Sequence, residues 1–230
     1  MGVSGFSYPA WRGTFYPKGA RSEDLLVEYA KKLECVEINS SFYGAPREDT
    51  IRNWADRTGN AFRFAFKAPR QVTHIAKIGP GSGEAANRFS MSLDLLGSKK
   101  GPILFQLPPF LRRDTKLLEG FLDSTASIGS RIFEFRNDSW FEESVFELLR
   151  DHGAGFCIAE TEDLEPKFMV TSGIAYFRLR KDAYDAKTID SWAKRIADTA
   201  KGAKQTYVFL RHDETGGNAV LAQRLVQKLA

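Results

Sequence analysis

Residues 62–68 read Phe-Arg-Phe-Ala-Phe-Lys-Ala, with phenylalanine at every second position up to Phe66. Successive side chains of a β-strand point to opposite faces of a sheet, so this alternation predicts a strand with one aromatic face and one face that carries Lys67. Short runs of similar character, rich in Phe, Ile, Val or Tyr, occur at residues 3–7, 35–40, 102–107, 131–136, 155–160, 175–180 and 206–211. The sequence therefore predicts eight strands.

Segments with helical periodicity lie between these strands, at residues 22–33, 47–58, 87–96, 116–124, 142–150, 191–200 and 219–229. Asp114 is the predicted N-cap of the fourth of them. The connection 161–171 contains Pro166 and shows no convincing helix. Eight βα units in order, with no change of pattern, predict a parallel (β/α)₈ TIM-like barrel as a single domain over residues 1–230, irregular after the sixth strand. A doubly wound open sheet is the alternative.

The composition is that of a globular protein, with 43% hydrophobic and 27% charged residues. The formal net charge of +4 comes from 33 basic and 29 acidic residues that are interspersed along the chain. A dedicated nucleic-acid-binding protein usually shows a basic stripe, so this charge permits nucleic acid as a partner without requiring it.

Cys35 and Cys157 are the two cysteines of the chain, and both lie inside predicted strands. They cannot support a disulfide scaffold, and no CxxC or Cys/His cluster indicates structural zinc. The second and sixth strands lie on opposite walls of an eight-stranded barrel, so we expect both thiols to be free. We expect a cytoplasmic protein, because no apolar stretch is long enough for a membrane helix and the first residues do not resemble a signal peptide.

In most of the predicted strands polar and apolar side chains alternate, so the polar ones lie on one face and the apolar ones on the other. In a barrel the apolar face packs against the helices. The polar set must then face the axis near the strand C-termini, where barrel enzymes build their active sites. We expect it to comprise Glu37, Asn39, Lys67, Gln106, Glu134, Arg136, Glu160, Arg178, Arg180 and Arg211. Three carboxylates against five basic groups predict a site for a phosphate or carboxylate group, with Arg136, Arg178 and Lys67 as its principal donors. Alternatively, these charges only pair with one another.

The predicted catalytic residues are Glu37 and Glu134, as general bases, and Lys67 beside them. The predicted ligand-binding residues are Tyr8, Asn39, Tyr43, Arg70, His74, Gln106, Arg136, Trp140, Arg178, Arg180 and Arg211. Aromatic residues of the loops at this end could stack on a base or sugar ring; they are Tyr8, Trp11, Phe42, Tyr43, Trp140 and Tyr184.

Other chemistries are less well supported by the sequence. A metal site would draw on Glu37, His74, Glu134, Glu160, His212 and Asp213, but no HxH or HxxxH spacing occurs, so we predict no cofactor and keep a divalent metal as an alternative. The fourth and seventh strands end in Gln106 and Arg178/Arg180, which argues against a retaining glycosidase with its two carboxylates. The glycine-rich segment 79–83 lacks the P-loop lysine, and a flexible loop is its preferred interpretation.

Several stretches resemble the YecE-like family, also called domain of unknown function 72. They are GVSGFSYPAWRGTFYP at 2–17, VEINSSFY at 36–43, FRFAFKAPRQVTH at 62–74, GPILFQLPP at 101–109 and FEFRNDSW at 133–140. The resemblance implies a barrel fold and brings no established reaction. The chain departs from the family pattern at Phe6, Asn137, Glu160 and 211–213, which puts roles for Asn137, Glu160 and His212 in doubt.

These observations predict a protein that binds an anionic small molecule, with acid–base or hydrolytic chemistry of a hydrolase or lyase type. Two alternatives remain at this point. The first is a non-catalytic protein that binds nucleic acid, and the second is a metal-dependent enzyme similar to phosphodiesterases or endonucleases.

Overall fold

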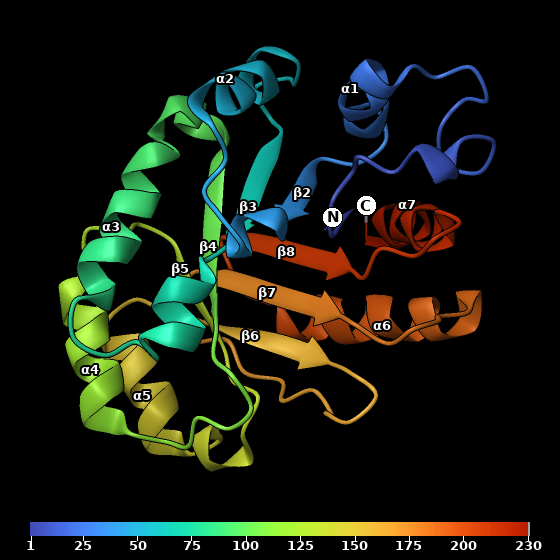
Figure 1. Cartoon of the computed structure of the whole chain (residues 1–230). Coiled ribbons are helices and arrows are strands. Elements are labelled where there is room, and N and C mark those ends of the chain that lie inside the picture. The colour runs from blue at the N-terminus through green and yellow to red at the C-terminus, as the bar shows by residue number, and fades with distance from the viewer. Residues whose placement is uncertain (230) are drawn as a thin grey trace.

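The computed structural model describes residues 1–229, in which eight parallel strands form a ring (Figure 1). The strands are β1 (Gly2–Val3), β2 (Cys35–Ile38), β3 (Arg63–Lys67), β4 (Lys100–Gln106), β5 (Arg131–Glu134), β6 (Gly155–Glu160), β7 (Ile174–Leu179) and β8 (Gln205–Leu210). Each strand from β2 to β7 pairs with the next, and β1 pairs with β8. A bridge between Ser4 and Glu37 brings β1 to β2 and nearly closes the ring. The predicted (β/α)₈ barrel is confirmed.

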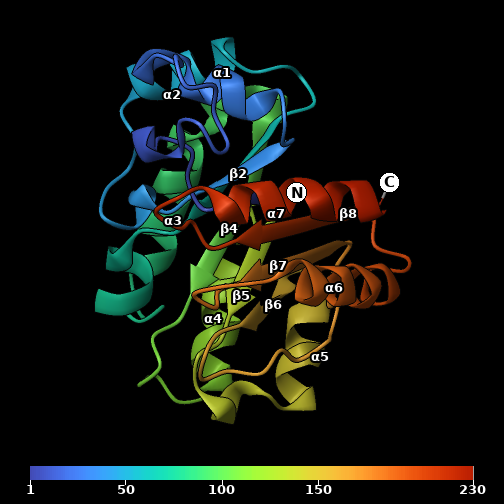
Figure 2. The same ribbon diagram turned by 90° about the vertical axis from the view of Figure 1, so that its right-hand side faces the viewer.

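The helices lie outside the ring of strands, as two perpendicular views show (Figures 1 and 2). They are α1 (Leu25–Ala30), α2 (Glu48–Asp56), α3 (Ser82–Ser92), α4 (Thr115–Ser124), α5 (Glu143–Asp151), α6 (Ala186–Thr199) and α7 (Gly217–Leu229). Asp114 caps α4 as predicted, because its carboxylate accepts a hydrogen bond from Leu117 N at 2.9 Å. The connection from β6 to β7 contains no helix within the described chain, which confirms the predicted irregularity. No helix among residues 1–229 is long and apolar enough to cross a membrane.

The third helix begins earlier than the sequence predicts. Gly81, with φ +77°, precedes its first turn, and Gly83 lies inside the helix. A Cβ at Gly83 would stand 2.2 Å from Ser124 Oγ, so glycine here lets α3 approach α4 closely. The interpretation of 79–83 as a flexible loop was therefore wrong for Ser82 and Gly83, which belong to α3. Gly83 allows the two helices to pack closely.

Two apolar clusters separate the inside of the barrel from its outside. The outer cluster lies between strands and helices and includes Phe64, Phe66, Phe105, Phe133 and Phe177. The smaller inner cluster fills the barrel with side chains of the opposite parity: Cys35, Ala65, Leu104, Ile132, Cys157, Ala159, Tyr176, Tyr207 and Phe209. The polar residues that continue this inner parity beyond the cluster therefore point to the mouth at the strand C-termini.

Both cysteines are free and buried on the inner face. Burial raises the pKa of each thiol, so little thiolate forms at neutral pH. We expect a chromogenic disulfide reagent to react slowly with the native protein and to titrate two thiols after denaturation without reductant. Titration of no thiol in the denatured chain would show that the cysteines are bridged and would contradict the placement of β2 and β6.

Candidate functional site at the barrel mouth

The centre of the barrel holds a buried arginine between two buried glutamates. Arg178 comes from β7, Glu37 from β2 and Glu134 from β5, and none of the three side chains is more than 2% exposed. Arg178 donates from Nε to Glu37 Oε2 at 3.0 Å, from Nη2 to Glu37 Oε1 at 2.8 Å and from Nη1 to Glu134 Oε2 at 2.5 Å. The guanidinium therefore ties three strands together across the barrel.

The remaining acceptor positions of these carboxylates are also occupied. Glu37 accepts from Tyr176 OH at 2.7 Å and from Ser4 Oγ at 3.1 Å, and Glu134 is paired with Arg136. Burial raises the pKa of Glu134, but Arg178 and Arg136 outweigh it and lower that pKa to about 2. The pKa of Glu37 is also lowered, because Arg178 and Arg180 outweigh its burial.

This geometry argues against the catalytic role predicted for Glu37 and Glu134. A general base must reach a substrate proton and bind it with adequate affinity. Both carboxylates are inaccessible and fully hydrogen-bonded, and a pKa of about 2 makes Glu134 a weak base. The same burial excludes Arg178 as a ligand donor, because its donors already serve the two glutamates. Glu37, Glu134 and Arg178 therefore follow the alternative interpretation, in which the inward charges only pair with one another.

Two other cations of the inner face have no carboxylate partner. Lys67 ends β3, and Arg180 follows β7. Lys67 Nζ lies 4.1 Å from the centroid of the Phe42 ring, and Arg180 Nη1 donates to Ser4 Oγ at 2.5 Å. Neither residue takes part in an ion pair anywhere in residues 1–229.

The electrostatic environment disfavours the charge on both groups. Burial, followed by the charge of Arg178, lowers the pKa of Lys67 to about 8 and that of Arg180 to about 10. With Glu37 and Glu134 matched by Arg178 and Arg136, the inner face keeps two positive charges that no acidic side chain neutralises.

Asn39 lies one residue beyond the end of β2, on the inner parity of that strand, and the register of β2 with β3 places it next to Lys67. Its side-chain oxygen is buried and has no hydrogen-bond partner within the described chain. Buried amide oxygens are nearly always hydrogen-bonded, and an unpaired one costs free energy. Asn39 is thus an acceptor available to a hydroxyl or amine that enters the mouth.

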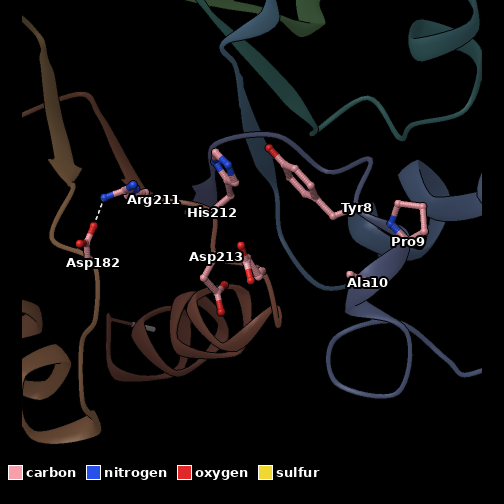
Figure 3. A pocket seen from close by; sticks show the side chains of 8 residues that line it. Tyr8, Pro9, Ala10, Asp182, Arg211, His212 and Asp213 are labelled. Carbon is pink, nitrogen blue, oxygen red and sulfur yellow. Dashed lines mark hydrogen bonds and ion pairs between the residues drawn. The ribbon is translucent and has the colours of Figure 1, made fainter.

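Two pockets flank the mouth. The larger, of about 710 Å³, is lined by the loops after β1, β7 and β8 (Figure 3). In it Tyr8 stacks on His212, with ring centroids 4.9 Å apart, and Arg211 pairs with Asp182. Arg211 is exposed and neutralised there, so it adds no free charge to the mouth. The second pocket, of about 480 Å³, is polar and is lined by residues that include Gln106, Arg136, Asn137, Thr161 and Asp163.

Two predicted site residues lie elsewhere. Glu160 shares its parity with Ile158 in the outer cluster, where it accepts from Tyr184 OH at 2.8 Å and pairs with Lys181 at 3.2 Å. Trp140 is fully buried, stacks on Phe135 with ring centroids 4.8 Å apart and donates to Leu111 O at 2.7 Å. Glu160 is therefore not part of the inward set, and Trp140 belongs to the core and cannot contact a ligand.

The loops after β2 and β3 carry the other predicted binding residues. Tyr43 is 79% exposed, and Arg70 is exposed at the start of the π-helical turn η4 (Gln71–Ile75). His74, in that turn, packs on the Phe42 ring in a T-shaped contact with ring centroids 4.8 Å apart. Phe42 was expected only as an aromatic residue of the loop after the second strand and was not among the predicted binding residues. The alternation of the seventh strand placed Tyr176 on the inner face, but it was not among them either.

A metal site receives no geometric support. Within residues 1–229 no group of three or more His, Cys, Asp or Glu side chains is placed to hold a metal ion. Of the residues considered for that site, Glu37 and Glu134 are saturated by arginine, and Glu160 faces away from the mouth.

Comparisons with known proteins agree with this architecture. A family model described as protein of unknown function DUF72 matches residues 1–230. The UPF0759 protein YecE of Escherichia coli (strain K12) is 29% identical over 154 residues, which are 66% of this chain and 54% of that protein. The chain thus spans about half the length of the curated relatives it matches.

Two crystal structures of similar proteins share the fold. A DUF72 family protein of Thermotoga maritima MSB8 is 24% identical with a TM-score of 0.83, and the match covers 100% of this chain and 99% of that one. A DUF72 family protein of Enterococcus faecalis V583 is 18% identical with a TM-score of 0.79, covering 99% and 94%.

Proposed function

Because this chain belongs to the DUF72 family of proteins of unknown function, we propose its function from the barrel mouth: it binds a small molecule that carries a phosphate or carboxylate group. The observation that carries the proposal is the pair of inner-face cations, Lys67 and Arg180, that have no acidic partner within residues 1–229. Placing two like charges in a partly buried site costs free energy, which an anion between them would recover. Arginine and lysine are the donors that such oxygens prefer.

The position of the two cations favours a small ligand over a polymer. Pockets of about 710 and 480 Å³ lie beside the mouth and have the size of small-molecule sites, but Lys67 and Arg180 line neither of them. Lys67 and Arg180 lie on the inner face of the ring of strands, which is too narrow for the backbone of a nucleic-acid duplex to reach them. Asn39 adds a requirement, because its buried oxygen accepts a hydrogen bond from a ligand donor. A hydroxy acid or a phosphorylated polyol satisfies both the charges and this acceptor.

We expect small anions to stabilise the wild-type protein against heat. At a concentration of about 100 times the dissociation constant, a ligand of the native state adds about 2.7 kcal/mol, which raises Tm by roughly 5–11 °C for a chain of this size. Inorganic phosphate, glycerol 3-phosphate and citrate are the probes, each tested at low and at high salt. A single-stranded oligonucleotide is measured beside them, because binding that weakens steeply with salt would instead indicate a nucleic-acid partner.

A pair of arginine variants tests whether the anion binds at the barrel mouth. Arg180→Met should weaken phosphate binding about ten- to a hundredfold, because one charge-assisted contact is lost. Arg88→Met removes an arginine that is 71% exposed on α3 and should leave the affinity unchanged. If no anion raises the Tm of the wild type at millimolar concentration, or if both variants bind alike, the proposal is wrong.

A further inference from the structure

Three side chains meet at the mouth around the Phe42 ring. The Lys67 amine lies over this ring at 4.1 Å, and the His74 ring packs against it in a T-shaped contact with centroids 4.8 Å apart and planes at 84°. Lys67 comes from the end of β3 and His74 from η4, so the same βα loop supplies the amine and the imidazole. Phe42 comes from the neighbouring loop after β2 and contacts both groups.

The backbone that carries His74 is unusual. Residues 71–75 form a single π-helical turn, a geometry that is rare and frequent at functional sites. The next residues, Lys77 and Ile78, adopt φ values of 53° and 55°, a region that a β-branched residue such as Ile78 seldom enters. Hydrogen bonds from Ala76 N to Gln71 O at 2.9 Å and from Ile78 N to Val72 O at 3.0 Å fix the turn. Strain of this kind is maintained where a side chain must be held in place.

The Lys67 amine is free to react. Unlike Arg136 and Arg178, it donates no hydrogen bond to a carboxylate within residues 1–229, so no ion pair holds its proton. Its charged neighbours are Arg178, Glu134, Glu37 and Arg180, and its pKa of about 8 leaves roughly a tenth or more of the amines neutral at pH 7.5, against about one in a thousand for an ordinary lysine. A partly buried lysine beside other cations is a known form of activated amine.

We infer that Lys67 is a nucleophile that forms an imine with an aldehyde or ketone group of the anionic ligand, and that His74 carries protons during this step. The inference rests on the proposed function, since the anion brings the carbonyl to the amine. The ligand class is thereby narrowed to oxo acids and phosphorylated aldehydes or ketones that also carry a hydroxyl group for Asn39.

The reaction is balanced without a further reactant. The lone pair of the neutral amine attacks the carbonyl carbon, the C–N bond forms, and the carbonyl electron pair moves to oxygen, which takes a proton. The nitrogen loses a proton to give the carbinolamine, whose hydroxyl group takes a second proton. The C–O bond breaks as the nitrogen lone pair forms the C=N bond, water leaves, and the iminium loses its remaining N–H proton to give the neutral imine. The sum is amine plus carbonyl giving imine plus water. His74 can relay these protons, because burial, Lys67 and Arg70 lower its pKa and keep the imidazole neutral at pH 7.

Reductive trapping tests the inference. The wild-type protein is incubated with glyoxylate or with pyridoxal 5′-phosphate, reduced with cyanoborohydride and mapped by peptide mass spectrometry. The two probes separate a carboxylate requirement from a phosphate requirement. We expect Lys67 to be modified at least about tenfold faster than Lys201, which is 77% exposed. His74→Gln should slow modification at Lys67 about tenfold and leave that at Lys201 unchanged.

Lys67→Arg distinguishes the inference from the proposed function, because arginine keeps the charge and cannot form an imine. Phosphate affinity, measured by calorimetry on the same preparations, should fall less in this variant than in Lys67→Met, while trapping at position 67 is lost in both. Wild type that binds phosphate but modifies Lys67 no faster than Lys201 overturns the imine alone. Wild type in which Lys67 is trapped rapidly but neither phosphate nor citrate binds overturns the proposed function instead.

Discussion

Replacement of Arg178 by methionine is expected to lower the free energy of unfolding by about 3–5 kcal/mol, the usual cost of removing one partner of a buried ion pair. Glu37 loses both hydrogen bonds that it accepts from the guanidinium, and Glu134 loses one. For a chain of this size the change corresponds to a fall in Tm of about 6–20 °C. Urea unfolding followed by circular dichroism measures it directly.

The pH dependence identifies the cause of that loss. In the wild type the pKa of Glu134 is lowered to about 2, so its contribution is fully present above the unfolded pKa of about 4.5 and is lost as the pH falls towards 2. Without Arg178, burial dominates at Glu37 and raises its pKa above the unfolded value. The variant should therefore lose stability as the pH rises from about 5 to 7, where the wild type does not.

Arg131 supplies the control. It is also buried, but it donates to the carbonyl oxygens of Leu122 and His152 and forms no ion pair within residues 1–229. Arg131→Met should destabilise the fold without creating new pH dependence in this range. An Arg178→Met variant whose stability follows the wild-type pH curve would show that Glu37 and Glu134 do not depend on this guanidinium.

The alternation of the strands was sufficient to predict which residues face the axis. Phe64 and Phe66 point to the helices, while Lys67 and, from other strands, Glu37 and Arg178 point inward, because the period of two leaves no other arrangement once one face is apolar. Glu160 was wrongly assigned to the inner face because it is charged, although its position in the alternation of β6 places it on the outer face. In β6 both faces are apolar or small, so the parity that it shares with Ile158 was less evident.

The pairing among inward charges could not be predicted in the same way. Parity gives a direction, whereas the partner of Arg178 depends on the height of each residue along the barrel and on the reach of its side chain. The two glutamates that looked suited to catalysis lie at the level that a guanidinium from β7 reaches, and the mouth above them retains Lys67 and Arg180. Trp140 was similarly misplaced because a loop position does not show whether an indole packs outward or into the core.

Joint replacement of Lys67 and Arg180 by methionine should abolish anion binding while leaving the fold at least as stable. Two charge-assisted contacts of about 1.5–3 kcal/mol each amount to a loss of affinity of roughly 10²–10⁴. Stability should not fall, because the lowered pKa values of both groups mean that the folded state disfavours their charges relative to the unfolded chain. Calorimetry with phosphate and urea unfolding of the same samples give both quantities.

The pH dependence of wild-type stability provides a second measure of the free energy that the buried charge of Lys67 costs the folded protein. Between about pH 8 and pH 10 the unfolded chain retains the Lys67 proton that the folded protein releases, so stability should rise with pH in this interval. The rise should be smaller in the double variant. A Lys201→Met protein, which loses an exposed ion pair with Asp198, should keep both the rise and the phosphate affinity. If the double variant instead unfolds more readily and still binds phosphate, the two cations serve the structure of the mouth and the anion site lies elsewhere.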